Sequence, residues 1–386
     1  MSSVLEIAKR LNKEFQNDKL AIMADVAPTY QRFSCGDLGL DFPLYGGLPL
    51  GRLCVFAGKE HSGKTLASCV EMAAYQRAFP EKICVFVDVE HSLDKAFQSA
   101  MTGVDLTKVL YVNPENMSGE QILDSILELQ QAENIGLIVH DSIPALVSSK
   151  DYDTDIDKDT GRAGGIARPL AKFIKKMVDQ IMMKNNILIL INQVRVVGQT
   201  HMGAAIYDEP GGHAPKYYSS VKVRFGSRTF TSGDKVDLTD GENADGFRLK
   251  FAITKNKTAS TQRGGGFLTF RYETGLDWAF DLLEIATKYE FIRRPNNKTY
   301  LLVNLETGEI YKDENGNELK ITGKAKLKQY FEDHPTFRDE YLHMLQNHIA
   351  QQDIRYTNLL DKREFEKIAA EEASVNGERD ESDSEE

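Results

Sequence analysis

The segment Gly58–Thr65 constrains the fold more than any other part of this 386-residue chain. Its sequence is Gly-Lys-Glu-His-Ser-Gly-Lys-Thr, with the second glycine directly followed by a lysine and a threonine. An apolar run at residues 53–57 precedes the segment, and a helical pattern follows it until Pro80. A strand, a glycine-rich loop and a helix in this order indicate a phosphate-binding loop (P-loop) of an α/β protein.

The chemistry of the loop follows from its residue types. The glycines allow consecutive backbone N–H groups to point inward and cradle phosphate oxygens at the N-terminus of the following helix. Lys64 can reach the β- and γ-phosphates, and the Thr65 hydroxyl can bind Mg²⁺. The predicted nucleotide-binding residues are Gly58, Lys59, Glu60, His61, Ser62, Gly63, Lys64 and Thr65.

Beyond the loop, strand-length apolar runs alternate with helical patterns. The runs cover residues 83–88, 110–112, 137–141 and 187–191, and the main helical patterns cover 121–130 and 167–183. Because the runs are continuously apolar, we expect strands buried on both faces, in a mainly parallel sheet between two layers of helices. Strand candidates at 221–225, 247–253 and 267–272 have hairpin-like spacing and predict an antiparallel extension of the sheet.

The sequence predicts five regions. Residues 1–32 contain an amphipathic helix that begins with a capping box formed by Ser3 and Glu6, and then a linker. The remaining regions are a nucleotide-binding core (33–272), a small α/β C-terminal domain (273–336), a helical extension (337–370) and a disordered acidic tail (371–386). In the C-terminal domain we expect helices at 282–289 and 325–331, and two strands at 300–304 and 309–312.

Composition excludes several classes of protein. The tail from 371 to 386 has eight acidic residues and one basic residue, so it carries −7 of the net charge of −11 and leaves −4 for the rest. The nearly neutral body is compatible with DNA binding. The four cysteines form no C-x-x-C pair, which favours buried free thiols over zinc or disulfides. No apolar run approaches the roughly 18 residues of a membrane span, so we expect a cytoplasmic protein.

Hydrolysis of a bound nucleotide needs a further carboxylate for the metal and a group that orients or activates water. Residues 137–142 have the form of a Walker B strand, in which Asp141 would hold Mg²⁺. Glu90 follows the strand at 83–88 and would reach the same edge of the sheet, where ligands bind in such folds. From the residues alone, Glu90 fits a catalytic role and a helix cap equally well.

Several further motifs occur in a fixed order along the chain. They are Gly47–Arg52, the P-loop, Asp88–Asp94, the Walker B strand, Ile191–Arg195, Gly211–Tyr218 and Lys255–Lys257. With these motifs the chain resembles the RecA-type homologous-recombination ATPases, which include bacterial RecA proteins and their UvsX-like phage counterparts. The match covers residues 34–272 and extends more loosely to about residue 335.

The resemblance implies roles for single residues. Glu90 would activate the attacking water and Gln193 would sense the γ-phosphate, while Glu60 is a competing base within the P-loop. Asp94 would bind the adenine amino group. Phe97 occupies the position that stacks on the base, where the family often has Tyr, and it keeps the ring face that stacking requires.

The resemblance also implies assembly. Lys255 and Lys257 would reach the γ-phosphate held by the neighbouring subunit and stabilise transition-state charge, so the active site would lie between subunits. Without the resemblance, two solvated lysines would be the better interpretation. The N-terminal helix would pack on the adjacent subunit, and head-to-tail contacts of this kind generate a helical filament.

Two segments, 149–165 and 194–211, match the positions of the family's DNA-binding loops. The candidate DNA-binding residues are Arg162, Arg168, Lys172, Lys175, Arg195, Met202, Gly211 and Gly212. The first segment departs from the expected chemistry, because aspartates occupy every second position from Asp151 to Asp159. Its spacing does not fit a calcium loop, and a solvated loop explains it as well as a DNA contact does.

The predicted function is that of an ATP-dependent DNA recombinase with ATP and Mg²⁺ as cofactors. It would form filaments on single-stranded DNA and catalyse pairing and strand exchange with homologous duplex DNA, in a bacterial or phage-infected cell. Its expected partners are both DNAs and other copies of itself, with a mediator and a single-strand-binding protein as candidate helpers. Two alternatives stay open: a ring-shaped helicase or motor, and a DNA-binding scaffold switched by ATP.

Overall fold

The computed structural model describes residues 3–16, 31–154, 165–199, 205–239, 241–259 and 264–351. The chain divides into two compact units, residues 1–31 and 32–386. The first contains helix α1 (Val4–Glu14), which begins with the predicted capping box: the Glu6 amide donates to Ser3 Oγ at 3.3 Å, and the Ser3 amide donates to Glu6 Oε2 at 2.8 Å. No residue of α1 is buried, and 79% of Val4 is exposed, so nothing described in this unit covers the apolar face of the helix.

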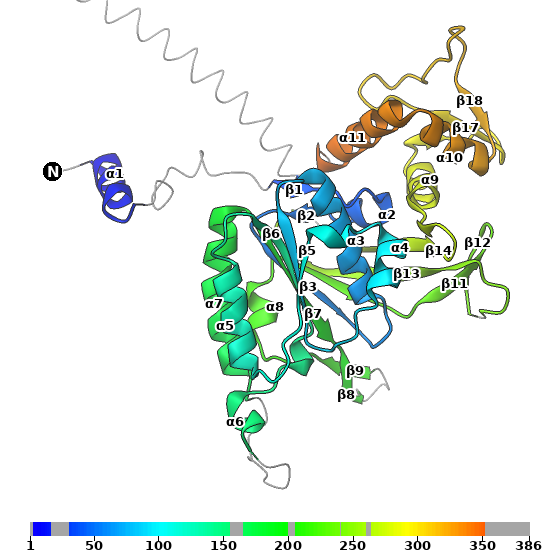
Figure 1. The fold of residues 1–386 in the computed structure, drawn as a ribbon. Helices are drawn as coiled ribbons and strands as arrows, with labels where there is room; N and C mark the ends of the chain where they lie inside the picture. Colours follow the sequence, from blue (N-terminus) through cyan, green and yellow to red (C-terminus); the bar gives the residue numbers. More distant parts are fainter. Residues whose placement is uncertain are drawn as a thin grey trace, which may run out of the picture. The chain divides into compact units, whose positions relative to one another are not determined.

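The second unit is built on a sheet of 11 strands (Figure 1). Six neighbouring strands run parallel in the order β10-β3-β7-β6-β4-β5; they are β3 (Leu53–Gly58), β4 (Ile83–Asp88), β5 (Val109–Val112), β6 (Ile135–Asp141), β7 (Ile187–Gln193) and β10 (Val221–Phe225). The antiparallel part comprises β11 (Thr229–Ser232), β12 (Lys235–Leu238), β13 (Gly246–Asn256), β14 (Gly265–Arg271) and β15 (Gly275–Leu276). The predicted mainly parallel sheet with an antiparallel extension is therefore confirmed.

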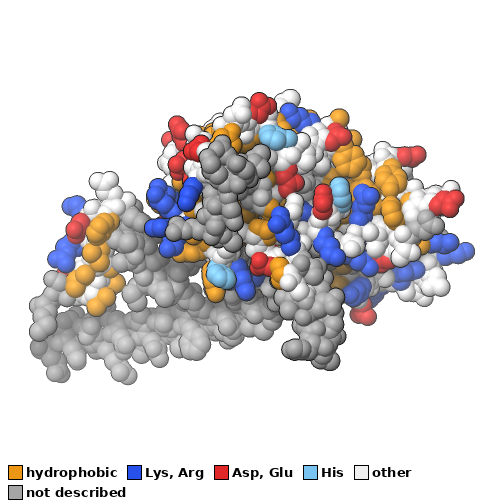
Figure 2. Space-filling model, turned by 90° about the horizontal axis from the view of Figure 1, so that it is seen from below, with side chains coloured by type: hydrophobic (Ala, Val, Ile, Leu, Met, Phe, Trp, Pro, Cys, Tyr) orange, Lys and Arg blue, Asp and Glu red, His pale blue; other side chains and the backbone are white. Residues whose placement is uncertain are grey.

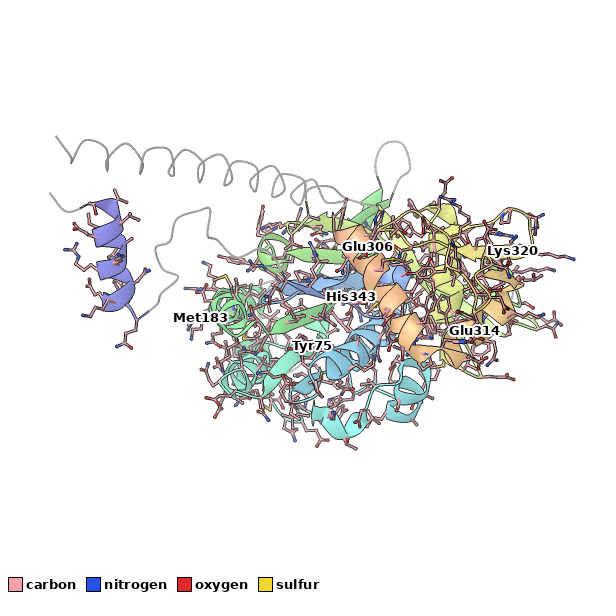
Figure 3. All side chains as sticks on the ribbon, turned by 90° about the horizontal axis from the view of Figure 1, so that it is seen from above. Tyr75, Met183, Glu306, Glu314, Lys320 and His343 are labelled. Atoms are coloured by element: carbon pink, nitrogen blue, oxygen red, sulfur yellow. The ribbon has the colours of Figure 1, made fainter. Side chains whose placement is uncertain are left out.

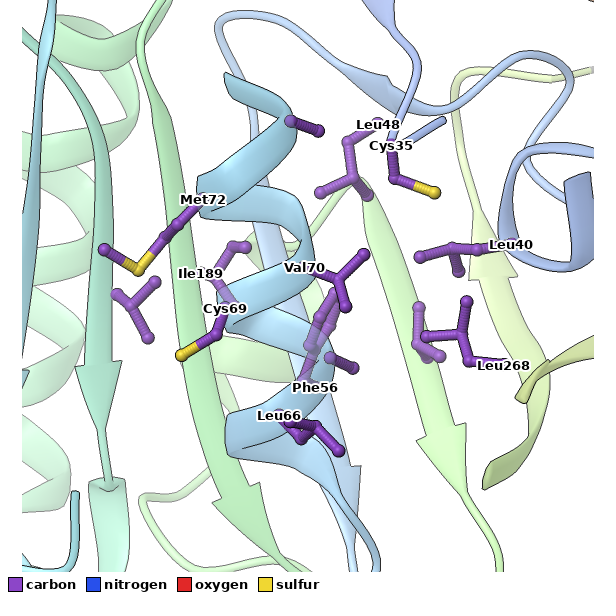
Figure 4. Close-up of a cluster of buried hydrophobic side chains, with 14 of the residues drawn as sticks. Cys35, Leu40, Leu48, Phe56, Leu66, Cys69, Val70, Met72, Ile189 and Leu268 are labelled. Atoms are coloured by element: carbon purple, nitrogen blue, oxygen red, sulfur yellow. The ribbon is translucent and has the colours of Figure 1, made fainter. Parts of the chain in front are cut away.

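Helices cover both faces of the parallel part (Figure 1). One layer contains α3 (Lys64–Ala78) and α4 (Lys95–Thr102), and the other contains α5 (Gly119–Leu129) and α7 (Ala167–Lys184). Alternate residues of β3 enter separate clusters: Phe56 packs with α3 residues such as Val70 (Figure 4), whereas Val55 belongs to the cluster that contains the buried faces of α5 and α7. This alternation explains why the strands are apolar throughout.

Short elements connect these layers. They are β1 (Arg32–Phe33), α2 (Leu38–Asp41), β2 (Leu48–Pro49), η2 (Leu106–Lys108), η3 (Ile143–Ala145), α6 (Ser149–Tyr152), β8 (Arg195–Gln199), β9 (Ala205–Asp208) and α8 (Ala214–Tyr218). Strand β1 pairs with β2, and β8 pairs with β9. All four cysteines of the chain are free and buried, as their spacing predicts.

The C-terminal region contains a small antiparallel sheet and three helices. Its elements are α9 (Trp278–Lys288), β16 (Ile292–Arg293), β17 (Thr299–Leu302), β18 (Lys320–Thr322), α10 (Lys324–Asp333) and α11 (Pro335–Gln351). The predicted strand at 309–312 is wrong, because these residues make only the isolated bridges Val303–Ile310 and Lys312–Glu318. They lie between two tight turns, closed by the amides of Gly308 and Gly316, so β17 pairs with β18 instead.

Helix α11 packs with this C-terminal region. Tyr341, Leu345 and Ile349 are buried in one hydrophobic cluster with residues of α9 and α10, and the Tyr341 hydroxyl donates to the Phe291 carbonyl at 2.9 Å. Figure 3 shows α11 in orange, with His343 on it, beside the small sheet that carries Lys320. The first part of the predicted extension (337–370) is therefore integral to the C-terminal fold. Residues 352–370 and the acidic tail lie outside the described residues.

Candidate active site

The strand order brings two of the predicted catalytic residues, Glu90 and Gln193, to one edge of the sheet. Strands β3, β7, β6 and β4 are neighbours and run parallel, so their carboxyl ends coincide. Gly58 at the end of β3 pairs with Gln193 at the end of β7, and Asp141 at the end of β6 pairs with Asp88 at the end of β4. The P-loop, Glu90, Asp141 and Gln193 consequently meet at this edge, where α/β folds bind ligands.

The P-loop has the backbone geometry that its glycines predict. Gly63 has a φ of 85°, and a β-carbon there would lie 2.5 Å from the side chain of Leu249. Lys59 orders the loop from within, because its carbonyl accepts hydrogen bonds from Ser62 Oγ and Lys64 Nζ, both at 2.7 Å. Burial lowers the pKa of Lys64.

Glu60 and His61 point away from the interior of the loop. Their side chains are 80% and 92% exposed, and His61 has a φ of 57°. Glu90, in contrast, is held at the carboxyl edge by hydrogen bonds from Ser142 and Gln193. The geometry favours Glu90 over Glu60 as the base.

Thr65 and Asp141, the two residues predicted to bind a metal, are in direct contact. Thr65 Oγ1 donates to Asp141 Oδ2 at 2.6 Å, across 76 residues of sequence. Burial raises the pKa of Asp141 to about 6; the charges of Glu90 and Asp88 add to the shift, while the Thr65 hydrogen bond and Lys64 oppose it. A hydroxyl and one carboxylate are hard oxygen donors, and Mg²⁺ commonly takes its remaining ligands from water and phosphates. The donor set therefore fits Mg²⁺ bound together with a nucleotide.

Glu90 lies at the centre of a small hydrogen-bond network. Gln193 Nε2 donates to Glu90 Oε1 at 3.0 Å, so the structure joins the predicted base and the predicted γ-phosphate sensor. Ser142 Oγ donates to the same oxygen. The amide of Glu90 donates to the Asp141 carbonyl at 3.3 Å, which ties it to the end of β6. Sequence reasoning missed Ser142, although its position next to Asp141 at a strand end was an available signal.

Comparison with known proteins identifies the fold. A family model described as the RecA N-terminal domain matches residues 3–277. The chain belongs to the RecA family. Protein RecA of Colwellia psychrerythraea is 30% identical over 309 residues, covering 79% of this chain and 80% of the relative. Protein RecA of Streptococcus gordonii is 30% identical over 368 residues (94% and 87%), and that of Streptococcus agalactiae is 30% identical over 347 residues (89% and 84%). The resemblance drawn from the motifs is confirmed.

Asp94 and Phe97 begin the helix that would flank the base in this RecA-family chain. Asp94 Oδ1 accepts a hydrogen bond from the Phe97 amide at 3.0 Å and caps α4. Phe97 is 40% exposed, so its ring is accessible for stacking. The preceding segment is fixed by Asp88, which is fully buried and accepts hydrogen bonds from the Tyr111 hydroxyl and from the amides of Ser92 and Leu93. Asp88 therefore organises the segment that carries Glu90.

The structure does not bring Lys255 and Lys257 to the P-loop of their own subunit. Lys255 lies level with Lys222 of β10, which in turn lies level with Val55 of β3. Three residues of strand separate Val55 from Gly58, or about 10 Å, and β13 runs away from the P-loop. Both ammonium groups donate to the carbonyl of Tyr217, at 3.1 Å from Lys255 and 2.8 Å from Lys257. A role in ATP hydrolysis therefore requires another subunit.

Arg168, Lys172 and Lys175 of α7 line one surface cleft. The cleft has a volume of about 560 Å³ and lies between α7 and α5, where Glu120 and Asp124 contribute opposite charges. Figure 2 shows the face seen from below in Figure 1, where Lys and Arg side chains are spread over much of the described surface. Three of the residues predicted to contact DNA thus line one cleft, whose acidic residues make it less basic than the sequence suggests.

The other residues predicted to contact DNA lie outside this cleft or outside the described residues. Arg195 is exposed at the start of β8, whereas Arg162 and Met202 lie outside the described residues, as does most of the Asp-rich segment. Gly211 and Gly212 have φ of 93° and 74°, and β-carbons there would lie 2.6 Å from Ile143 and 3.0 Å from Ala167. Backbone conformation and close packing alone therefore account for glycine at these two positions.

Among the residues that the structure describes, no helix combines the length and the apolar character needed to cross a membrane.

Proposed function

We propose that this RecA-family protein is a DNA-dependent ATPase that forms helical filaments on single-stranded DNA and catalyses strand exchange with homologous duplex DNA. One observation supports the catalytic part above all. The metal pair Thr65–Asp141 and the pair Gln193–Glu90 lie side by side at the P-loop edge of the sheet. This is the arrangement that hydrolysis of a nucleotide γ-phosphate requires.

Each residue has a defined part in the reaction. Lys64 binds the β- and γ-phosphates, and Thr65 and Asp141 would hold Mg²⁺. The metal would supply positive charge that offsets the negative charge of the phosphates. Glu90 accepts a proton from water as the water oxygen bonds to the γ-phosphorus. The bond between that phosphorus and the bridging oxygen breaks, so ATP and water give ADP and phosphate, while Gln193 binds the transferred group.

Assembly completes the site in this proposal. Lys255 and Lys257 lie at the far edge of the sheet from their own P-loop, so they would serve the nucleotide of a neighbouring copy. Positive charge from a neighbour stabilises the transition state of phosphoryl transfer in the manner of an arginine finger. Helix α1, whose apolar face is exposed, would supply the packing contact between copies. Hydrolysis would then occur only in assembled protein.

Single-stranded DNA would bind along the basic face of α7, together with the loop segments 149–165 and 194–211. The lysines at 172 and 175 lie on one exposed side of α7 and can track a phosphate backbone. We expect binding to weaken steeply with salt, since several phosphate contacts release counterions. An affinity for single-stranded DNA that hardly changes between about 0.05 and 0.2 M salt would contradict this role.

Electron microscopy of the full chain tests the proposal. The protein is mixed with single-stranded DNA and a non-hydrolysable ATP analogue, and helical filaments are expected. Closed rings would favour the helicase alternative, and DNA-bound particles without filaments would favour the scaffold. Lys64→Ala is the matched control, since it should lose nucleotide-dependent filaments. Strand exchange is measured with a homologous duplex against a heterologous one of equal length.

A further inference from the structure

Ser142 is a buried hydroxyl that the P-loop and Walker B motifs leave without a role. It directly follows Asp141 and occupies the N-cap position of η3. A serine there normally accepts a hydrogen bond from the backbone of the following turn. Ser142 makes no such capping bond, and its hydroxyl donates to Glu90 Oε1 instead. The side chain is therefore directed across the sheet, from the end of β6 to the segment after β4.

The second donor to the same oxygen has a competing task. Gln193 Nε2 also binds Glu90 Oε1, but the proposed function requires Gln193 to contact the γ-phosphate. Its hold on Glu90 consequently depends on the nucleotide. Ser142 is fully buried between Asp141 and Ile143, which are also buried, so its position does not depend on that movement. Both donors bind Oε1, which leaves Oε2 to receive the proton of the attacking water.

We propose that Ser142 is the positioning residue of the catalytic carboxylate: it holds Glu90 Oε1 while Gln193 turns toward the γ-phosphate. The inference rests on the proposed ATPase function and deepens it. Hydrogen bonds to charged groups are among the stronger ones in proteins, and a carboxylate free to rotate loses its alignment with the water. Removal of the hydroxyl should therefore lower kcat by about 10- to 100-fold.

The test compares Ser142→Ala with wild type in single-stranded-DNA-stimulated ATP hydrolysis by the full chain. We expect the loss in kcat, with KM for ATP changed less than about twofold, because Ser142 does not touch the nucleotide.

Further variants separate positioning from general damage. Ser142→Thr keeps the hydroxyl and should retain more activity than Ser142→Ala. In a Glu90→Gln background, Ser142→Ala should cause no additional loss, because the residue acts through Glu90. Ser99→Ala is the matched control. It removes a hydroxyl of α4 that donates to the Val104 carbonyl, beyond the end of the helix, at 3.0 Å, and it should leave kcat unchanged.

The outcomes distinguish the inference from the function on which it rests. A Ser142→Ala protein with wild-type kcat overturns the positioning role alone. So does an effect that adds fully to that of Glu90→Gln, or a Ser142→Thr protein as impaired as Ser142→Ala. Wild-type protein that binds ATP but never hydrolyses it, with or without single-stranded DNA, overturns the proposed ATPase and the inference together.

Discussion

The ammonium group of Lys255 makes the proposed intersubunit catalysis sensitive to pH in a defined direction. Burial lowers the pKa of Lys255 to about 8, and the charges of Lys257, Lys222 and Lys216 contribute. A group with this pKa is about 90% charged at pH 7 and about 10% charged at pH 9. If the charge is needed on a neighbour's γ-phosphate, DNA-stimulated kcat/KM should fall about tenfold between these pH values.

The matched variant is Lys255→Arg. A guanidinium stays charged well beyond pH 9, so the alkaline decrease in kcat/KM should disappear, even if the altered shape lowers activity throughout. The assay is steady-state ATP hydrolysis with saturating single-stranded DNA, measured from pH 6.5 to about 9.5, the range that brackets the pKa of Lys255. A Lys255→Arg protein with the same alkaline limb as wild type would refute the assignment.

Deprotonation of Lys255 does not itself destabilise the folded protein. The pKa of Lys255 in the folded protein lies below its ordinary value near 10.4, so between about pH 8 and 10 the unfolded chain binds more protons than the folded one. The contribution of this group to stability therefore increases with pH over the range in which activity should decrease. The four buried cysteines, whose pKa values burial raises, lower stability over the same pH range in both proteins. Thermal unfolding of wild type and Lys255→Arg at pH 7 and 9 therefore isolates the contribution of Lys255. A parallel loss of activity and stability in wild type, absent from Lys255→Arg, would contradict the reasoning.

Three further predictions concern catalysis, the core and the second loop. Glu90→Gln should lower kcat at least about 100-fold with unchanged ATP affinity, measured by single-turnover hydrolysis and nucleotide titration. Arg248→Met should cost about 3 kcal/mol in denaturant unfolding, because Arg248 is almost fully buried within 3.7 Å of the buried Asp281 carboxylate. Gly211→Ala should destabilise the fold by about 1–3 kcal/mol through its left-handed φ and close packing, whereas Gly308→Ala, with open space around it, should cost less.

Local patterns were sufficient to predict the elements that carry the site. The apolar runs at 83–88 and 187–191 became β4 and β7, since each strand is buried on both faces and needs no knowledge of its neighbours to be recognised. The same holds for α7, whose apolar positions recur along one face. The P-loop, Glu90 and Gln193 could be placed at one edge because parallel strands align their carboxyl ends.

Features that depend on pairing between distant segments could not be predicted in this way. Ser142 contacts Glu90 across 52 residues, and only the order of the strands brings them together. The distance of Lys255 from its own P-loop follows from strand register, which the sequence does not state. Residues 309–312 have the composition of a strand, yet turns on both sides leave them with single bridges.

The contacts around the end of β7 give a physical reason to expect that nucleotide state affects DNA binding. The second loop begins directly after Gln193, and it ends at Gly211, which packs closely against Ile143. Asn192 Nδ2 donates to the Pro210 carbonyl at 3.0 Å, so the residue before Gln193 holds the end of the loop. Ile143 in turn follows Ser142, which binds Glu90. Both ends of the loop are therefore anchored on residues next to those that hold the Glu90 carboxylate. We expect a movement of Gln193 toward a γ-phosphate to be transmitted through these anchors to the segment proposed to bind DNA.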